Sequence, residues 1–325
     1  MEPEDGRMAC PPIQEKIIVV EMIYNLKFAK IFHIVKLFLH PRDFLFELSQ
    51  VFPKCFPDKL FLKVVYRHVT GEKLHIHNPR NFNEKIQWLK LYDRDPEYTK
   101  LVDKYEVKDY IRKTIGDEYV IPTLAVYNKA EEIDFDALPI QFVLKCTHDS
   151  GGVVICNDKS KLDKQNAIKL LGDGLKKNFY YQNREWPYKN VIPRIIAEQY
   201  MVDESGEELK DYKFFCFYGE PKIIQVDYDR FVDHKRNLYD IEWNRLPFTL
   251  QFPTNWNYEI AKPQSLGEMI EVARKLSKGI PHVRVDLYHI NGKVYFGEMT
   301  FYHGSGYEKF TPGDWNNTLG EWIKI

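Results

Sequence analysis

Two carboxylates, Asp286 and Glu298, are the residues whose types and spacing most directly suggest chemistry. Each lies in a run rich in β-branched and aromatic residues, and the two runs flank Asn291-Gly292, a dipeptide typical of a tight β-turn. Facing carboxylates with a hydroxyl such as that of Thr300 beside them supply the oxygen ligands that Mg²⁺ prefers. Solvated charges on an ordinary hairpin are the alternative interpretation.

The register of this predicted hairpin decides whether the two carboxylates meet. A two-residue loop with an unbroken ladder places Asp286 opposite Gly297 and turns Glu298 to the other face of the sheet. A three-residue loop that includes Lys293, or a β-bulge, places Asp286 opposite Glu298 on one face. A metal site at this hairpin therefore predicts the longer loop or a bulge.

The elements that must position these residues belong to a chain of 325 residues, long enough for two or three domains or one large one. Lys+Arg 46 and Asp+Glu 47 give a net charge of -1, so no nucleic-acid partner is expected. Five scattered cysteines without a C-x-x-C pair fit a reducing compartment, and the protein is expected to be cytoplasmic. The apolar segment 17–39 is interrupted by charges, which favours a packed or interfacial helix and leaves peripheral membrane attachment open.

Helical patterns occupy the first third of the chain. Residues 17–48 predict one or two helices, and residues 58–109 predict more, with Asn81 or Asn83 as an N-cap. Lys104 and Lys108 stand four apart, a spacing that predicts one helical face. Taken alone, such lysines are typical of a solvated surface.

A glycine-rich segment interrupts two predicted strands. The apolar strand 142–146 carries Lys145 and is followed by Ser150-Gly151-Gly152, after which a strand resumes at 153–156. This order predicts a hairpin with a flexible tip rather than a strand-to-helix phosphate loop. Glycine backbone N–H groups could close over phosphate oxygens there, with Lys145 as a cation. Turn chemistry alone is the other interpretation.

An apolar strand in the range 191–201 carries Glu198 near its end and is followed by an acidic segment with Glu204. Such a strand can offer backbone groups to the edge of an adenine and a carboxylate to its amino group. A further hairpin follows, turning at 219–221, in which Lys213 shares a face with Asp211. Arg230, close to a basic cluster at 234–236, suits a phosphate or carboxylate substrate or a solvated loop.

The order of these features resembles the ATP-grasp superfamily. More closely, four segments are similar to the TupA-like branch, which takes part in teichuronopeptide biosynthesis: Asn81 to Trp88, Leu144 to Gly152, Asp211 to Phe217 and Gly297 to Thr300. The resemblance covers the chain roughly from residue 78 to its end and leaves about the first 75 residues uncovered.

The resemblance implies an α+β protein with an ATP-grasp fold, in which two α+β subdomains hold ATP between them. A helical N-terminal region of residues 1–95 is expected first, then a small subdomain of residues 96–197 with the glycine-rich loop. A large subdomain of residues 198–325 with the metal and acceptor site completes the expected organisation.

The resemblance also implies roles by matched position. Lys104, Lys145, Ser150, Gly151 and Gly152 would bind phosphates, and Glu198, Gln199, Tyr200, Met201 and Glu204 would bind the adenine side of ATP. Asp286, Glu298 and Thr300 would hold Mg²⁺, and Lys213, Arg284 and Ser305 would act on the reacting oxygens. Arg230, His303 and Gly304 would contact the substrate. One departure is Thr300, which stands where many ATP-grasp enzymes have Asn but still offers an oxygen.

The implied activity is that of a carboxylate–amine ligase that uses ATP and Mg²⁺, forms an acyl phosphate and releases ADP and phosphate. The implied partners are a small-molecule amine and a carboxylate-bearing sugar or glycan. That carboxylate would belong to a uronic acid or acidic residue of a capsular or cell-wall polysaccharide, and a peripheral membrane or a larger polysaccharide-synthesis assembly would be a further partner. The alternatives are a sugar or glycan kinase on the same scaffold and a non-catalytic glycan-binding module.

Overall fold

The computed structural model describes residues 41–149, 151–202, 209–229 and 233–325. The chain forms two compact units, residues 1–55 and 56–325, and each is described by itself. The described part of the first unit consists of helix α2 (Pro41–Val51) and the 3₁₀ turn η1 (Pro53–Cys55). The helices expected between residues 17 and 40 lie outside the described residues. None of the helices in the described ranges is long and apolar enough to cross a membrane.

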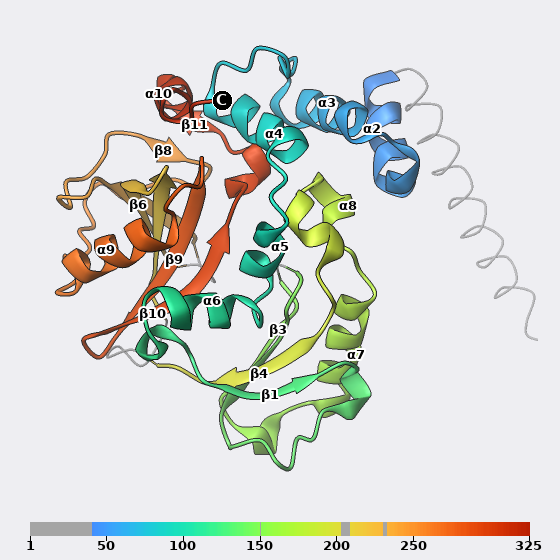
Figure 1. The fold of residues 1–325 in the computed structure, drawn as a ribbon, viewed down its shortest axis with the longest axis vertical. Coiled ribbons are helices and arrows are strands. Elements are labelled where there is room, and N and C mark those ends of the chain that lie inside the picture. Colours follow the sequence, from blue (N-terminus) through green and yellow to red (C-terminus); the bar gives the residue numbers. More distant parts are fainter. Residues whose placement is uncertain (1–40, 150, 203–208, 230–232) are drawn as a thin grey trace, which may run out of the picture. The chain divides into compact units, whose positions relative to one another are not determined.

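The larger sheet of the second unit has five antiparallel strands, and β6, β9 and β10 are labelled on the left in Figure 1. Its order is β10-β9-β5-β6-β7, with β5 (Asp211–Phe217), β6 (Glu220–Tyr228), β7 (Lys235–Tyr239), β9 (Val283–Ile290) and β10 (Lys293–Thr300). Side chains alternate across a strand, so one face of this sheet is apolar and packs on helix α9 (Leu266–Leu276). The opposite face carries the charged residues Lys213, Arg284 and Asp286.

A four-stranded antiparallel sheet has the order β1-β4-β2-β3. Its strands are β1 (Thr123–Tyr127), β2 (Phe142–Cys146), β3 (Val153–Cys156) and β4 (Ile195–Gln199). Phe142, Leu144 and Cys146 point to one face and form a core with helix α7 (Lys164–Leu175). The alternating residues Val143 and Lys145 therefore point to the other face.

The remaining elements of the second unit surround the sheets. The helices are α3 (Asp58–Thr70), α4 (Phe82–Tyr92), α5 (Glu97–Val102), α6 (Val107–Thr114), α8 (Tyr180–Asn183) and α10 (Asp314–Trp322). Short 3₁₀ segments are η2 (Asp117–Tyr119), η3 (Ala130–Glu132), η4 (Lys159–Lys161), η5 (Trp186–Asn190) and η6 (His303–Gly306). Strands β8 (Thr249–Leu250) and β11 (Phe310–Thr311) form a small separate sheet.

Helix α4 begins at one of the two predicted caps. The side chain of Asn81 accepts a hydrogen bond from the backbone N–H of Glu84, which satisfies one of the free donors of the first turn. The prediction that Lys104 and Lys108 share a helical face is wrong. Lys104 lies in the turn between α5 and α6, and Lys108 alone is helical. Lys108 is also only 6% exposed, so it is not a surface lysine.

The hairpin of β9 and β10 has the register that a metal site requires, and it reaches that register through a bulge. Asn291 (φ 51°) and Gly292 (φ 80°) form a two-residue turn of left-handed residues, and regular pairing runs from there to the pair Phe296 and Leu287. The ladder then shifts at Gly297, and Glu298 pairs with Asp286. The bulge prediction is confirmed, and the alternative three-residue loop is not formed.

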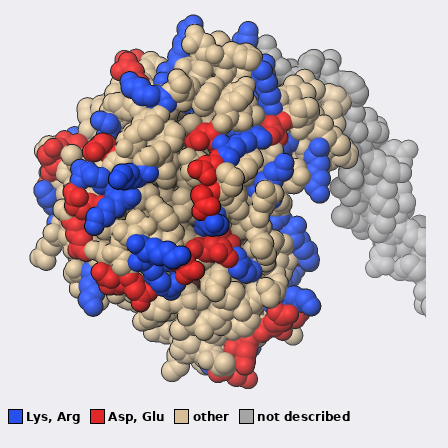
Figure 2. Space-filling model, in the orientation of Figure 1, with Lys and Arg blue, Asp and Glu red and all other residues tan. Residues whose placement is uncertain are grey.

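The division into three domains at residues 95 and 197 stays a prediction. Residue 197 lies inside β4, so Glu198 belongs to the four-stranded sheet together with β2 and β3. Across the face shown in Figure 2, acidic and basic side chains interleave rather than separating into regions of one sign.

Candidate functional site

A cavity of about 420 Å³ opens between residues of the two larger sheets. It brings together seven residues that the sequence predicts for one site: Lys104, Lys145, Glu198, Gln199, Tyr200, Met201 and Glu298. The other lining residues are Ile121, Val143, Val153, Ile155, Val202, Leu209, Asp211, Tyr288 and Gly297. One part of the lining is thus apolar, and another carries charges of both signs.

The apolar part of the cavity is a consequence of strand alternation. Val143 lies on the face of β2 that points away from helix α7, and Val153 and Ile155 follow on the edge strand β3. Ile155 is 61% exposed, which is unusual for a branched apolar side chain in a sheet. Exposed apolar side chains that line a cavity favour contact with a flat apolar ring.

Glu198 forms the negative centre of one cavity wall. Its two carboxylate oxygens pair with Lys145 Nζ and Lys108 Nζ, each at 2.5 Å. Lys108 also donates to the carbonyl of Ile121 and to the hydroxyl of Thr123. Burial favours protonation of Glu198, but the two lysines outweigh it and hold the pKa of its carboxyl below the ordinary value. The expected roles of Lys145 with phosphate and Glu198 with adenine stay predictions, since here the two side chains bind each other.

Lys104 reaches the same cavity from the turn before α6. Its backbone N–H donates to the carbonyl of Thr147 at 3.0 Å, and its ammonium group donates to the carbonyl of Asp149. Burial, together with the charge of Lys145, lowers the pKa of Lys104 below its ordinary value, while Glu298 opposes that shift. Lys104 therefore fixes one end of the glycine-rich segment. Gly151 there has a φ of 120°, which requires glycine.

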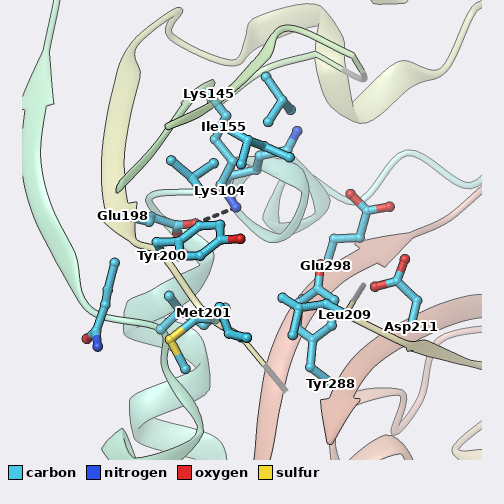
Figure 3. A pocket seen from close by; sticks show the side chains of 16 residues that line it. Lys104, Lys145, Ile155, Glu198, Tyr200, Met201, Leu209, Asp211, Tyr288 and Glu298 are labelled. Atoms are coloured by element: carbon cyan, nitrogen blue, oxygen red, sulfur yellow. Dashed lines mark ion pairs between the residues drawn. The ribbon is translucent and has the colours of Figure 1, made fainter. Parts of the chain in front are cut away.

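Glu298 and Asp211 rise from the five-stranded sheet on the opposite side of the cavity (Figure 3). The Glu298 side chain is partly exposed and accepts from Arg284 at 3.2 Å and from the Thr300 hydroxyl at 3.3 Å. Burial raises the pKa of Glu298, but the charges of Lys104 and Arg284 outweigh burial and hold it below the ordinary value. Glu298 is thus an ionised carboxylate that faces the cavity.

Asp286 differs from Glu298 because it is already saturated with cations. The Arg284 guanidinium donates to both of its oxygens at 2.7 Å, and Lys213 Nζ donates to Oδ2 at 3.1 Å. Asp286 is 2% exposed and is absent from the cavity lining. A metal ion could use this carboxylate only after one of these N–H donors is released.

His303 joins Arg284 to the chain that follows β10. Arg284 Nη1 lies 2.9 Å from His303 Nδ1, so Nδ1 is the acceptor and Nε2 carries the proton that is donated to Glu308 at 2.9 Å. Burial lowers the pKa of His303 below its ordinary value, although Glu308 acts in the opposite direction. The neutral ring therefore holds the Arg284 guanidinium in place.

The turn that contains the predicted site residues His303, Gly304 and Ser305 has a strained backbone, and Ser305 already makes hydrogen bonds. Gly304 and Ser305 have φ values of 52° and 53°, and Gly306 has 68°. The Ser305 hydroxyl donates to Glu185 Oε1 at 2.6 Å and accepts from Lys90 Nζ at 3.0 Å. The catalytic role expected of Ser305 and the substrate roles expected of His303 and Gly304 stay predictions.

Sequence reasoning missed several charged residues of this site. Asp211 carried a signal in its alternation with Lys213, whereas the spacing of Lys108 from Lys104 indicated a shared helical face that is not formed. Lys90 and Glu185 gave none, because their partners are far away in the chain. Three predicted residues, Ser150, Glu204 and Arg230, lie outside the described residues. In the neighbouring basic cluster, Arg236 turns inward to Asp227 and Glu308.

The residues present fit a nucleoside triphosphate with a divalent cation. The apolar lining around Val143 and Ile155 suits a base, while Lys104 and Lys145 suit phosphate oxygens. Within the described ranges, no group of three or more His, Cys, Asp or Glu side chains could hold a metal by itself. Oxygen ligands from one or two carboxylates, completed by phosphates and water, are nevertheless the usual environment of Mg²⁺.

A comparison with protein families matches residues 84–324 to the family described as TupA-like ATPgrasp. The chain belongs to this family. Its fold is accordingly the α+β ATP-grasp fold that the sequence predicted, preceded by a helical N-terminal region. A search of curated proteins found no match.

Solved structures similar to this chain include the D-alanine–D-alanine ligase of Helicobacter pylori, with 15% identity, a TM-score of 0.38 and coverage of 69% of this chain and 63% of that one. The phosphoribosylamine–glycine ligase of Thermotoga maritima shows 14% identity, a TM-score of 0.39 and coverage of 63% and 48%. The ATP-grasp ligase PsnB, solved with a minimal precursor, Mg and ADP, shows 10% identity, a TM-score of 0.37 and coverage of 70% and 61%. The chain thus spans between about half and two thirds of the length of these proteins.

Proposed function

We propose that the protein is an ATP- and Mg²⁺-dependent carboxylate–amine ligase that forms an amide bond through an acyl phosphate. The observation that carries this proposal is the cavity in which Lys104 and Lys145 face the ionised Glu298. Phosphoryl transfer needs positioning and charge neutralisation more than covalent help from the protein. Membership of the TupA-like ATP-grasp family supports the same reaction class.

In this proposal, different side chains of the site bind the adenine, the phosphates, the metal ion and the reacting oxygens. Val143, Val153 and Ile155 would pack on the adenine ring, and Glu198 with the backbone near Tyr200 would bind its polar edge. Lys104 and Lys145 would bind phosphates, which compete with Glu198 for the Lys145 ammonium group. Bound Mg²⁺, held by Glu298 and Asp286, would neutralise triphosphate charge. Arg284 and Lys213, adjacent to those carboxylates, would bind the reacting oxygens.

The finer part of the proposal concerns the substrates. We assign the acylated carboxylate to a uronic acid or acidic residue of a capsular or cell-wall polysaccharide, and the nucleophile to a small-molecule amine. This assignment rests on the family, whose TupA-like members the sequence resembles from residue 84 onward. A polysaccharide-synthesis assembly is the corresponding macromolecular partner.

The test combines ATP, Mg²⁺, uronic-acid oligosaccharides and a panel of primary amines, with ADP and amide product as readouts. Glu298→Gln should lower turnover at least ~100-fold, because it removes the ionised carboxylate that faces the cavity. The exposed Glu131→Gln is the matched control and should keep wild-type turnover. A phosphorylated product that resists hydroxylamine would instead identify a sugar kinase. Binding of the oligosaccharide with no ATP turnover would identify a non-catalytic module.

A further inference from the structure

Three residues from distant parts of the chain meet at the turn η6. Lys90 in helix α4 donates to the Ser305 hydroxyl at 3.0 Å and to the Ser305 carbonyl at 2.9 Å. The Ser305 hydroxyl in turn donates to Glu185 Oε1 at 2.6 Å. Ser305 thus bridges a buried cation and a buried anion that make no direct ion pair in the described chain.

Burial of these charged side chains is unfavourable for the stability of the fold. Lys90 is 0% exposed, Glu185 7% and Ser305 9%. Taking a lysine and a glutamate out of water is unfavourable, and apolar side chains of similar volume often give an equal or more stable protein. Burial lowers the pKa of Lys90 and raises that of Glu185, although each partner opposes the shift of the other. Paired groups with shifts of this kind cluster at functional sites.

The cluster is connected to the reaction site through the turn η6. Ser305 lies two residues after His303, whose ring accepts from Arg284, and Arg284 binds Asp286 and contacts Glu298. Glu185 also responds to the charges of Arg284 and Glu298. Its second oxygen, Oε2, has no hydrogen-bond partner among the described residues. One oxygen of Glu185 is therefore anchored, and the other is free to take a proton.

We infer that Glu185 is the proton acceptor for the incoming amine and that Lys90 and Ser305 position it. This inference rests on the proposed ligase activity. An alkyl amine has a pKa of about 10.4, so at neutral pH it arrives as an ammonium ion without a lone pair. Glu185 Oε2 takes one proton from that ammonium group, and the freed lone pair attacks the acyl carbon of the acyl phosphate. The new C–N bond forms, the C–O bond to phosphate breaks, and inorganic phosphate leaves with that electron pair and with the second N–H proton.

The experiment compares two nucleophiles on the same acyl phosphate. Enzyme, ATP, Mg²⁺ and uronic-acid oligosaccharides are incubated either with L-lysine or with hydroxylamine, which is largely unprotonated at neutral pH and needs no base. For Glu185→Gln we expect amide formation with L-lysine to fall ~100-fold or more, the usual range for loss of a general base. Hydroxamate formation should stay within ~3-fold of wild type. Glu185→Asp should restore part of the amide rate.

A second variant keeps the test valid if the single substitution leaves Lys90 buried without its counter-charge and unfolds the protein. Lys90→Met combined with Glu185→Gln removes both charges, so the fold should persist while amide formation is lost and hydroxamate formation is kept. Lys90→Met alone should shift the acidic limb of the kcat profile for amide formation and leave the hydroxamate profile in place. The charged or titratable groups that act on Glu185 or feel its charge are Lys90, Arg284, Glu298, Tyr188, Tyr302 and Tyr307.

Equal loss of amide and hydroxamate in a folded Glu185→Gln enzyme would overturn the inference, since Glu185 would then serve acyl phosphate formation or structure. Retention of both products would overturn it as well. Failure of the wild-type enzyme to give hydroxamate with any carboxylate would instead contradict the proposed ligase function, and the inference would fall with it.

Discussion

At the scale of single residues, Glu308 links the turn η6 to strands β6 and β7 of the five-stranded sheet. It accepts from His303 Nε2 and from Arg236 Nη1, both at 2.9 Å, and Arg236 continues to Asp227 at 2.7 Å. Burial opposes ionisation of Glu308, but His303 and Arg236 outweigh it and lower its pKa to about 2. The Arg284 guanidinium is therefore connected through His303 and Glu308 to the buried ion pair of Arg236 and Asp227.

The first prediction concerns the pH dependence of stability. The ordinary pKa of glutamate is about 4.3, so the lowered pKa of Glu308 corresponds to about 3 kcal/mol of stability at pH 7. Because the folded pKa is the lower one, this contribution is present above pH ~4.3 and is lost as the pH falls towards about 2. Urea unfolding should show Glu308→Gln less stable than wild type by about 3 kcal/mol at pH 7, with more than half of that difference gone at pH 3.

Exposed Glu131→Gln is the control and should match wild type at both pH values. A stability difference for Glu308→Gln that stays constant between pH 7 and pH 3 would contradict the ion-pair explanation.

At the scale of elements, the β9–β10 hairpin shows how a turn and a bulge together set the chemistry of a strand. The two-residue turn alone would separate Glu298 from Asp286, and the extra residue Gly297 restores the pairing. A Cβ at Gly297 would lie 3.0 Å from the Asp286 carbonyl and 3.1 Å from the Tyr288 ring, so the bulge needs glycine for space.

The second prediction concerns the turn of this hairpin, where glycine is needed for conformation rather than space. A Cβ at Gly292 would meet nothing within 4 Å, but its φ of 80° is strained for any other L-residue. Gly292→Ala should therefore lower the free energy of unfolding by about 1 kcal/mol. Gly267→Ala in helix α9 is the matched control, since it also has open space but helical backbone. It should raise stability by roughly 0.5–1 kcal/mol. Two equal effects of the same sign in chemical denaturation would refute this account.

At the scale of the whole second unit, the C-terminal helix α10 packs against helix α4. Lys85 Nζ donates to the carbonyls of Gly320 and Ile323 at 2.8 Å, and the Asn83 side chain donates to the Glu308 carbonyl at 2.9 Å. Leu319 and Ile323 are fully buried in the main core. Helices α4 and α10 of this unit are therefore joined by hydrogen bonds and by a shared core.

The third prediction tests this packing. A Cβ at Gly320 would lie 2.8 Å from backbone atoms of Asn81 and Phe82, which cannot move without shifting the start of α4. Gly320→Ala should lower the free energy of unfolding by about 1–3 kcal/mol. Gly313→Ala, where a Cβ meets nothing within 4 Å and φ is -63°, should change it by less than about 0.5 kcal/mol. Similar values for both variants in urea unfolding would show that the contact with α4 is not close.

The sequence alone predicted what depends on neighbouring residues. The strand 142–146 and the cap at Asn81 followed from side-chain periodicity and local hydrogen bonding, which act over a few residues. The pairing of Asp286 with Glu298 was also predictable, because both lie in one hairpin and only a turn and a bulge separate the alternatives.

Only the tertiary structure decided which charges meet. Lys108 pairs with Glu198, and Lys90 reaches Ser305, across separations of 90 and 215 residues that no local pattern covers. The tertiary structure also decided the partners of Asp286. The sequence predicts Asp286 as a metal ligand, but its oxygens accept hydrogen bonds from Lys213 and Arg284 because β5 lies beside β9. Local sequence sets the face on which a side chain lies, whereas long-range packing sets its partner and therefore its charge state.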